Sequence, residues 1–478
     1  MSPDLIAIVP MLCVTLAGLA CMTAEAFRSP GERWPIGLFG MIGLAGAALS
    51  SALLWNRNSE GFGVIVADNF GLFVTIVLVV VGVLTIMFSS QVITRDGISA
   101  GEYYSLTLFS IVGMIMMATA NDLLVIFIAL EILSLAVYVL TGIRRESLAS
   151  TEAAFKYFLL GAFSSAFFLY GIAFTYGVTG STRLGVVGST LSAQAMSGSP
   201  MVLIALGLLL VGFAFKISAV PFHMWTPDAY EGAPAIVTGF MSTGVKAAAF
   251  AAFARVFLSS FEPFKDNWTP LVAALAAATM ILGTVVGVAQ SNLKRMLAYS
   301  SIAHGGYLLV GLVAANQVGK AAILFYLLAY SVTNLAAFGV IAMLGNRDRA
   351  NDDLRDYAGL WHSRPALAAL MTVCLLSLGG LPPTVGFIGK WYIFSAAVSA
   401  GYYGLAVIGV LTSVISVFFY LRVVVMMYMS DREAAVAPPR VGGWGIAALT
   451  VAIVAIFYLG ILPTRVLDLA AESIATIF

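Results

Sequence analysis

The sequence predicts an all-α polytopic membrane protein with about 14 transmembrane helices, forming two inverted five-helix repeats in which helices 7 and 12 are broken. Composition is the first observation: 61% of the 478 residues are hydrophobic, only 10% are charged, and the mean hydropathy is +0.99. Apolar runs of about 18 residues or more, long enough to cross a bilayer, recur along most of the chain. The third observation is that two apolar segments each combine a lysine with helix-interrupting prolines.

Fourteen spans result when the chain is divided at polar residues and at Gly/Pro breaks. The expected ranges are 4–27, 34–55, 69–91, 102–119, 122–142, 152–178, 200–221, 234–258, 269–291, 297–315, 318–345, 365–397, 401–429 and 441–462. The first segment is expected to be a retained span and not a signal peptide, because its apolar run is long and no basic region precedes it.

The spans group into four parts. Residues 1–100 are expected to hold three N-terminal transmembrane helices, and residues 101–260 the first five-helix repeat, helices 4–8. Residues 265–430 are expected to form the second repeat, helices 9–13, and residues 431–478 helix 14 and a C-terminal tail. Because five is an odd number, a second copy in the same chain direction is inverted across the membrane. We expect the tail to form a short terminal helix.

The distribution of Lys and Arg predicts the orientation, because these residues accumulate on the cytoplasmic side. Fifteen of them follow odd-numbered spans: Arg28, Arg33, Arg95, Arg144, Arg145, Lys156, Lys294, Arg295, Arg347, Arg349, Arg355, Arg364, Arg422, Arg432 and Arg440. Six lie on the other side: Arg57, Arg183, Arg255, Lys265, Lys320 and Arg465. Both termini are therefore predicted to lie outside, in the periplasm or its equivalent. The expected membrane is the bacterial plasma membrane, with an organelle as the alternative host.

The remaining three basic residues, Lys216, Lys246 and Lys390, fall inside spans, and Glu131 is an acidic residue near the middle of a span. A charge at the bilayer centre costs roughly 2.5–3.5 kcal/mol on insertion scales, so such residues mark a function or an internal ion pair. Lysine suits proton transfer because burial favours its neutral amine whereas a nearby carboxylate favours its ammonium form. Moving or neutralising Glu131 would then make the lysine release its proton.

Two stretches resemble each other: "KISAVPFHMW", which begins at Lys216, and "LSLGGLPPTVGFIGKW", which contains Lys390. These lysines are 174 positions apart, and Glu131 and His304 are 173 positions apart. Broken helices at membrane depth expose backbone groups and therefore line cavities. His304 lies where the first copy carries Glu131, and a histidine can pass a proton in either direction, although a packed, hydrogen-bonded role is the alternative. At the same offset Lys246 meets Tyr420, so the second copy lacks that charge.

The segments "FKISAVPFHMWTPDAYEGAP", "NLKRMLAYSSIAHGGY" and "GGLPPTVGFIGKWYIF" resemble the antiporter-like membrane subunits of respiratory complex I over essentially the whole chain. The order of the motifs, the number of spans and the residues of the first motif are most similar to those of the N branch of that family. The resemblance implies a charged chain through mid-membrane. It implies that Glu131 modulates the protonation of Lys216. It also implies that Lys246 and His304 connect Lys216 to Lys390, the terminal lysine in broken span 12.

The resemblance further implies a proton-translocating subunit of an NADH:quinone oxidoreductase. No Gly-rich phosphate loop or paired Cys motif occurs in the sequence, so no cofactor or metal is expected in this chain. NADH, flavin, iron–sulfur clusters and quinone are expected in partner subunits. The expected partners are the other membrane and peripheral subunits, including neighbouring antiporter-like subunits, and the lipid bilayer. The net charge of +1 argues against nucleic acid.

Two alternatives stay open at this point. A subunit of a multisubunit sodium/proton antiporter would carry similar repeats, and a sodium requirement would distinguish it. A structural membrane scaffold would use the buried charges only to fix helix packing, and its transport would survive their removal.

Overall fold

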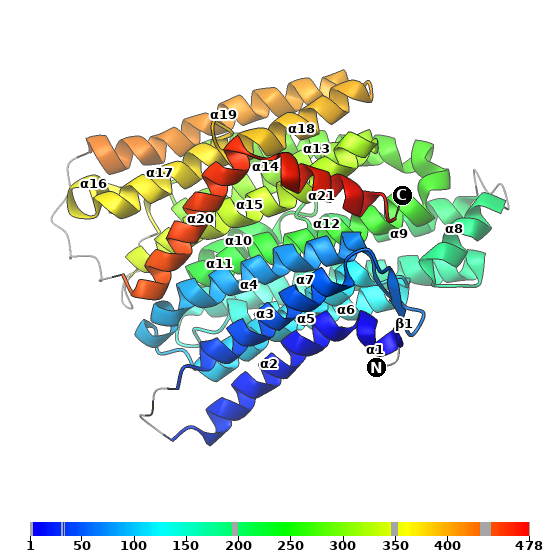
Figure 1. Cartoon of the computed structure of the whole chain (residues 1–478). Coiled ribbons are helices and arrows are strands. Elements are labelled where there is room, and N and C mark those ends of the chain that lie inside the picture. Colours follow the sequence, from blue (N-terminus) through cyan, green and yellow to red (C-terminus); the bar gives the residue numbers. More distant parts are fainter. Residues whose placement is uncertain are drawn as a thin grey trace.

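The computed structural model describes residues 3–29, 32, 34–193, 199–345, 352–430 and 441–477. Arg33, Arg347, Arg349, Arg432 and Arg440, used above to predict orientation, lie outside the described residues. The helices run side by side as one bundle, and the two labelled termini lie at the same end of it (Figure 1). This is the arrangement expected for an even number of spans.

Within the described ranges, twelve helices are long and apolar enough to cross a membrane. They are α2 (Val9–Phe27), α3 (Ile36–Leu54), α4 (Asn69–Arg95), α5 (Ala100–Thr119), α6 (Leu123–Thr141), α7 (Leu148–Thr179), the continuous helix Ala235–Ser260, the helix Glu262–Val288 that includes α13 (Lys265–Val288), α14 (Leu293–Ala314), α15 (Gln317–Leu344), α19 (Tyr403–Met429) and α20 (Gly443–Ile461). Two broken spans bring the number of crossings to the fourteen that the sequence predicts, and the all-α polytopic fold class is confirmed.

The first broken span consists of α9 (Pro200–Lys216) and α10 (Trp225–Gly232). The second consists of α17 (Pro365–Gly379) and α18 (Val385–Ser399). Proline has no backbone N–H and cannot continue a helix, and a residue with positive φ ends one. Ser218 has φ of 63° just after α9, and Gly380 has φ of 82° just after α17. The sequence predicts that span 7 continues to residue 221, whereas α9 ends at Lys216.

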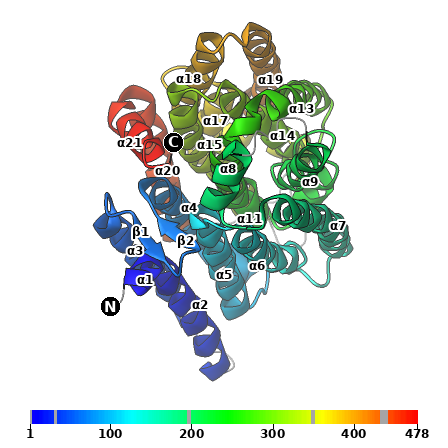
Figure 2. The same cartoon turned by 90° about the vertical axis from the view of Figure 1, so that its right-hand side faces the viewer.

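The continuous helix Ala235–Ser260 is built from α11 (Ala235–Phe240), a π-helical turn η1 (Met241–Val245), α12 (Lys246–Arg255) and a second π-helical turn η2 (Val256–Ser260). This helix, α14 and α15 are buried almost completely inside the bundle. Figure 2 shows α15 in the interior, with α2, α7 and α19 at the edge. Residues on the interior helices are therefore shielded from lipid by the outer helices.

Short elements complete the ends of the bundle. They are α1 (Pro3–Ala7), the antiparallel pair β1 (Ser59–Gly61) and β2 (Ile65–Ala67), α8 (Leu184–Ala193), η3 (Glu262–Phe264), η4 (Leu354–Tyr357), α16 (Leu360–Ser363) and α21 (Thr464–Ile474). The tail thus forms a short terminal helix, as expected. It packs on α15 and α4 through an apolar face that includes Leu467 and Ala470.

A buried ion pair joins helices at the end of the bundle that holds both termini. Arg255 Nη1 and Nη2 donate to the two carboxylate oxygens of Asp68 at 2.7 and 2.9 Å, and both side chains are 5% exposed. Arg255 also donates to the Ala118 carbonyl, at 3.0 and 3.1 Å. The sequence places Arg255 near the end of the predicted span 234–258, whereas the structure buries it inside the bundle between α4, α5 and α12.

Candidate functional site

The structure places four of the five predicted site residues in the interior of the bundle. Lys216, Lys246, His304 and Lys390 are 3%, 2%, 3% and 4% exposed, respectively. Glu131, on α6, is only partly buried. Each lysine has hydrogen-bond partners, and none of the three has its amine in an ion pair among the described residues.

Lys216 is the last residue of α9, at the break of this span. Its Nζ donates to Ser134 Oγ at 2.7 Å. The rings of Tyr138 and Tyr157 lie with their centroids 5.8 and 5.6 Å from the same atom. The charge is therefore surrounded by polarisable and hydroxyl groups from α6 and α7.

Glu131 connects to the Lys216 site through Ser165 on α7. The Ser165 hydroxyl donates to Glu131 Oε1 at 2.5 Å. Ser165 and Lys216 also line one small cavity of about 10 Å³, together with Gly161 and Gly212. Such a space holds about one water molecule. The carboxylate and the amine can thus communicate through one hydroxyl and a space for about one water molecule. Nothing in the sequence singled out Ser165.

Lys246 begins α12, directly after the π-helical turn η1. π-Helical turns inside α-helices are frequent at functional sites. Lys246 Nζ donates to Ser301 Oγ at 2.6 Å and also to the Ser301 carbonyl. A Cβ atom on Gly305 would lie 3.2 Å from the Ile217 carbonyl oxygen and 3.7 Å from Lys246 Nζ. The glycine therefore leaves open the space between the end of α9 and the second lysine.

His304, on α14, is held by two tyrosines. Its Nδ1 lies 2.5 Å from the Tyr326 hydroxyl and its Nε2 lies 3.3 Å from the Tyr420 hydroxyl. Tyr420 also hydrogen-bonds to Ser300, the neighbour of the residue that binds Lys246. A tyrosine hydroxyl can donate and accept, so it can hand a proton on. Tyr420 was visible in the sequence only as the counterpart of Lys246, whereas Tyr326 had no signal.

Lys390, on α18, points at the broken end of α17. Its Nζ donates to the carbonyls of Leu378 and Gly379 at 2.8 and 3.1 Å and to Ser413 Oγ at 2.8 Å. The ring centroid of Tyr307 lies 5.1 Å from the amine, and this ring packs edge-on against His304 at 5.4 Å. The unpaired carbonyls of a helix C-terminus stabilise a cation at this position.

The two broken helices carry their lysines at different positions. Lys216 ends the first half of its span, whereas Lys390 lies in the second half of its span and reaches back to the first half. The spacing of 174 positions therefore does not place the lysines at equivalent points of the two helices. Lys390 Nζ lies against the C-terminal carbonyls of α17, whereas Lys216 Nζ donates to a serine of α6. The shared feature is that each lysine lies beside a helix break.

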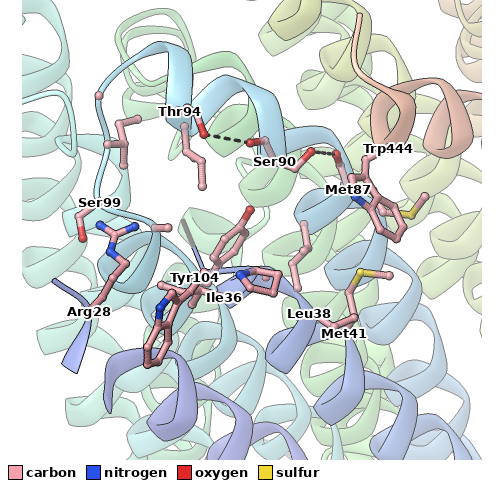
Figure 3. A pocket seen from close by; sticks show the side chains of 18 residues that line it. Arg28, Ile36, Leu38, Met41, Met87, Ser90, Thr94, Ser99, Tyr104 and Trp444 are labelled. Atoms are coloured by element: carbon pink, nitrogen blue, oxygen red, sulfur yellow. Dashed lines mark hydrogen bonds between the residues drawn. The ribbon is translucent and has the colours of Figure 1, made fainter. Parts of the chain in front are cut away.

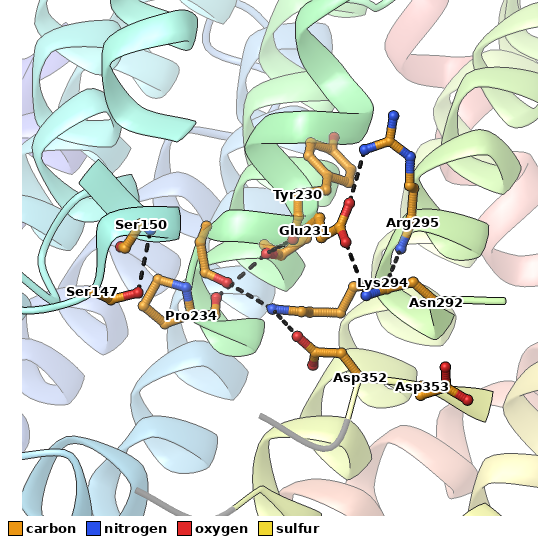
Figure 4. A network of polar contacts seen from close by, with 12 residues as sticks. Ser147, Ser150, Tyr230, Glu231, Pro234, Asn292, Lys294, Arg295, Asp352 and Asp353 are labelled. Atoms are coloured by element: carbon orange, nitrogen blue, oxygen red, sulfur yellow. Dashed lines mark hydrogen bonds and ion pairs between the residues drawn. The ribbon is translucent and has the colours of Figure 1, made fainter. Parts of the chain in front are cut away.

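An ion network covers the opposite end of the bundle from the termini (Figure 4). Arg295 on α14 binds Asp228 and Glu231 of α10 at 2.7 and 2.8 Å. Lys294 binds Asp352 at 2.8 Å and the Ala233 carbonyl at 3.2 Å. Burial raises the pKa of Asp352, and Lys294 opposes this shift only in part. The network attaches the second half of the first broken helix to α14 and to the segment that begins at residue 352.

Lys294→Met should destabilise the protein by about 1–3 kcal/mol at pH 8, because Asp352 would be buried without its partner. The pKa of this carboxyl is already above its unfolded value, so protonation favours the folded state as the pH falls. The difference in melting temperature between variant and wild type should therefore shrink between pH 8 and pH 5. Lys156→Met, at a lysine that is 44% exposed, is the control. A difference independent of pH would show that Asp352 is not responsible.

Comparison with known proteins identifies a family and individual relatives that this chain resembles. The model of the family described as NADH:quinone oxidoreductase/Mrp antiporter, transmembrane, matches residues 120–416. NADH-quinone oxidoreductase subunit N of Trichlorobacter lovleyi is 44% identical over 98% of this chain and 97% of its own length. A protein from Solibacter usitatus named NADH-quinone oxidoreductase subunit N 1 is 41% identical over 99% of this chain and 98% of its own length.

Solved structures show the same fold. A chain of respiratory complex I from Thermus thermophilus superposes with a TM-score of 0.83 at 36% identity, covering 97% of this chain and 99% of that one. A chain of the Mrp complex from a Dietzia species has a TM-score of 0.86 at 22% identity, covering 100% and 98% of the two chains. At that identity the second likeness concerns the fold alone.

Proposed function

This chain belongs to the transmembrane family of the NADH:quinone oxidoreductases and Mrp antiporters, and on that premise we propose that it conducts protons through the buried row of Glu131, Lys216, Lys246, His304 and Lys390. The resemblance to the N branch of the complex I subunits, drawn from its motifs, is confirmed by relatives that match over nearly the full length. The proposed activity is that of a membrane subunit of NADH:quinone oxidoreductase, with quinone reduction taking place elsewhere in the complex.

The observation that carries the proposal is a row of ionisable and hydroxyl groups that runs from one helix break to the other. Ser301 and Ser300 adjoin in the chain, and they link Lys246 to Tyr420 and hence to His304. The Tyr307 ring lies between His304 and Lys390. Between Lys216 and Lys246 the space next to Gly305 would be bridged by water. A scaffold needs a hydrogen-bond partner for each buried charge but no series of hydroxyls that leads from one charge to the next, whereas a proton path does.

In this proposal Glu131 controls Lys216 electrostatically. A carboxylate stabilises the ammonium form of the lysine, and its withdrawal or protonation favours release of the proton toward Lys246. Glu131 is suited to receive an external signal because it is partly exposed, and Ile128, Ile132 and Leu135 beside it on α6 are exposed as well. We propose that a neighbouring subunit covers this face of α6, so that a change there moves the carboxylate.

The remaining parts of the proposal concern the surroundings of the chain. NADH, flavin, iron–sulfur clusters and quinone would bind to partner subunits, including peripheral ones, and the neighbours in the membrane would include other antiporter-like subunits. The host membrane would be the bacterial plasma membrane, with both termini periplasmic and the ion network of Figure 4 cytoplasmic. The ratio of fifteen to six basic residues supports this orientation. Protons would be taken up at the cytoplasmic end.

Glu131→Gln and Ser165→Ala should both reduce proton movement per NADH oxidised while the complex still assembles, with the larger loss in Glu131→Gln. The first variant removes the charge, and the second removes the hydroxyl that joins it to the Lys216 cavity. The measurement is quenching of a pH-sensitive dye in vesicles that contain the purified complex. Thr175→Ala is the matched control for Ser165→Ala. Thr175 also lies on α7, and its hydroxyl donates to the Gly171 carbonyl of α7 itself and, within the described ranges, to no charged residue.

Wild-type pumping in both variants would contradict the switch assigned to Glu131. Transport that requires sodium, in a complex that does not oxidise NADH, would instead support the antiporter alternative. The curated relatives named above favour the oxidoreductase, because the antiporter likeness concerns a structure only 22% identical.

A further inference from the structure

A cavity of about 620 Å³ lies apart from the proton path, at the end of the bundle opposite the termini. Its walls come from α3, the end of α4, the start of α5 and the first residues of α20. This volume is within the range of about 300–1,000 Å³ that is typical of small-molecule binding sites. None of the relay residues lines it.

The cavity is polar at one end and apolar at the other (Figure 3). Arg28, Ser99 and Thr94 lie toward one side of it in this view, whereas Met41 and Met87 lie toward the other. Leu38, Ile86 and Ile93 add further apolar wall. A ligand that fits this gradient has a charged or polar head and a long apolar tail.

The direction of the gradient agrees with the bilayer. Thr94 is the next-to-last residue of α4, and Met87 lies seven residues earlier on the same helix. At a rise of 1.5 Å per residue, Met87 is about 10 Å deeper in the membrane. Trp34 and Trp444, which are 42% and 53% exposed, line the cavity near the start of α3 and of α20. Tryptophan at helix ends is typical of the membrane–water interface.

The polar end carries a salt bridge whose arginine keeps further N–H donors for a ligand. Arg28 Nη2 donates to Glu25 Oε1 at 2.5 Å. A guanidinium has five N–H donors, and among the described residues this is the one hydrogen bond that the Arg28 guanidinium donates. Glu25 is engaged from a second side, because it also accepts from the Gly101 backbone N–H at 2.9 Å. Ser99 and Ala100, at the N-terminus of the 20-residue helix α5, line the same end. A helix N-terminus and an arginine together favour a phosphate group.

We propose that this cavity binds one anionic phospholipid of the adjacent leaflet. The headgroup phosphate lies between Arg28 and the N-terminus of α5, and an acyl chain extends between Met41 and Met87. Basic residues near a membrane surface attract anionic lipids, which sets the preference over a zwitterionic lipid. The bound lipid would join the N-terminal helices to α20, since Trp444 of α20 lines the cavity together with residues of the first 104 positions.

The test uses the purified complex in vesicles that contain phosphatidylglycerol with a photoreactive group in the acyl chain, followed by mapping of the crosslinked peptides. Crosslinks should appear on the peptides of Met41 and Met87, several-fold above those obtained with phosphatidylcholine carrying the same group. Met41→Trp fills the cavity and should remove most of the signal. Ile42→Trp is the matched control, because Ile42 is 61% exposed on the outer side of the same helix.

Arg28→Gln should abolish the preference for phosphatidylglycerol, whereas Arg145→Gln should keep it. Arg145 follows α6 at the same end of the bundle, its side chain is 83% exposed, and it does not line the cavity. If Met41→Trp does not assemble, Ser90→Leu fills the same cavity from α4. Equal labelling by the two lipids in the wild type, or displacement of the lipid by added quinone, would overturn the proposal. Unchanged crosslinking in the filled variants would also overturn it.

Discussion

Lys216→Met should leave the complex assembled and NADH oxidation measurable, and should lower coupled proton movement by at least about tenfold, which corresponds to about 1.4 kcal/mol. Methionine keeps the length and apolar packing of the lysine stem but has no proton to give. The Ser134 hydroxyl and the cavity shared with Ser165 would then lead to a residue that cannot ionise. The measurement is dye quenching in vesicles, normalised to the rate of NADH oxidation.

Two further variants separate a relay from a fixed structural charge. Lys216→Arg keeps the positive charge at the end of α9 but holds its proton at all accessible pH values, so transport should remain low. A scaffold would instead be rescued by arginine. Lys265→Met, at the first residue of α13 and outside the row, should transport like the wild type. Wild-type proton movement in Lys216→Met would remove this residue from the path.

Asp68→Ala should destabilise the protein by about 3–5 kcal/mol, because it leaves the guanidinium of Arg255 buried without its counter-charge. Both side chains are nearly inaccessible, and Arg255 also holds the Ala118 carbonyl. The expected results are a lower melting temperature and less assembled complex in the membrane. Replacing both partners, as Asp68→Leu with Arg255→Met, should recover most of the stability, because no buried charge is left unpaired.

Asp122→Ala is the matched control for this ion pair. Asp68 caps α4 by accepting from the Gly71 N–H, and Asp122 caps α6 by accepting from the Leu124 and Val125 N–H groups. Loss of a cap costs about 0.5–2 kcal/mol. Asp68 also binds Arg255, whereas Asp122 also accepts from the Thr182 hydroxyl at 2.7 Å, so the difference between the two variants reports the ion pair relative to a neutral hydrogen bond. Equal destabilisation would show that the pair contributes no more than that hydrogen bond.

The number of spans and the identity of the charged site residues could be read from the sequence for a physical reason. The hydrocarbon thickness fixes the length of a crossing helix, so apolar runs mark the spans one by one. Charges are costly in that layer, so Lys216, Lys246, Lys390 and Glu131 were conspicuous without any knowledge of their neighbours. The prolines and glycines near two of the lysines likewise predicted both helix breaks.

What stabilises and connects these groups was decided only by the tertiary structure. Ser134 meets Lys216 across 82 positions, Ser301 meets Lys246 across 55, and Asp68 meets Arg255 across 187. Serine, threonine and tyrosine occur throughout the spans, and local sequence does not show which of them face a given amine. The fold selects them, because an interior charge is stable only where packing of distant helices brings hydroxyls, carbonyls or a counter-ion to it. The lengths of the apolar runs thus set how many helices cross the membrane, residue type sets which charges they carry, and packing sets what each charge touches.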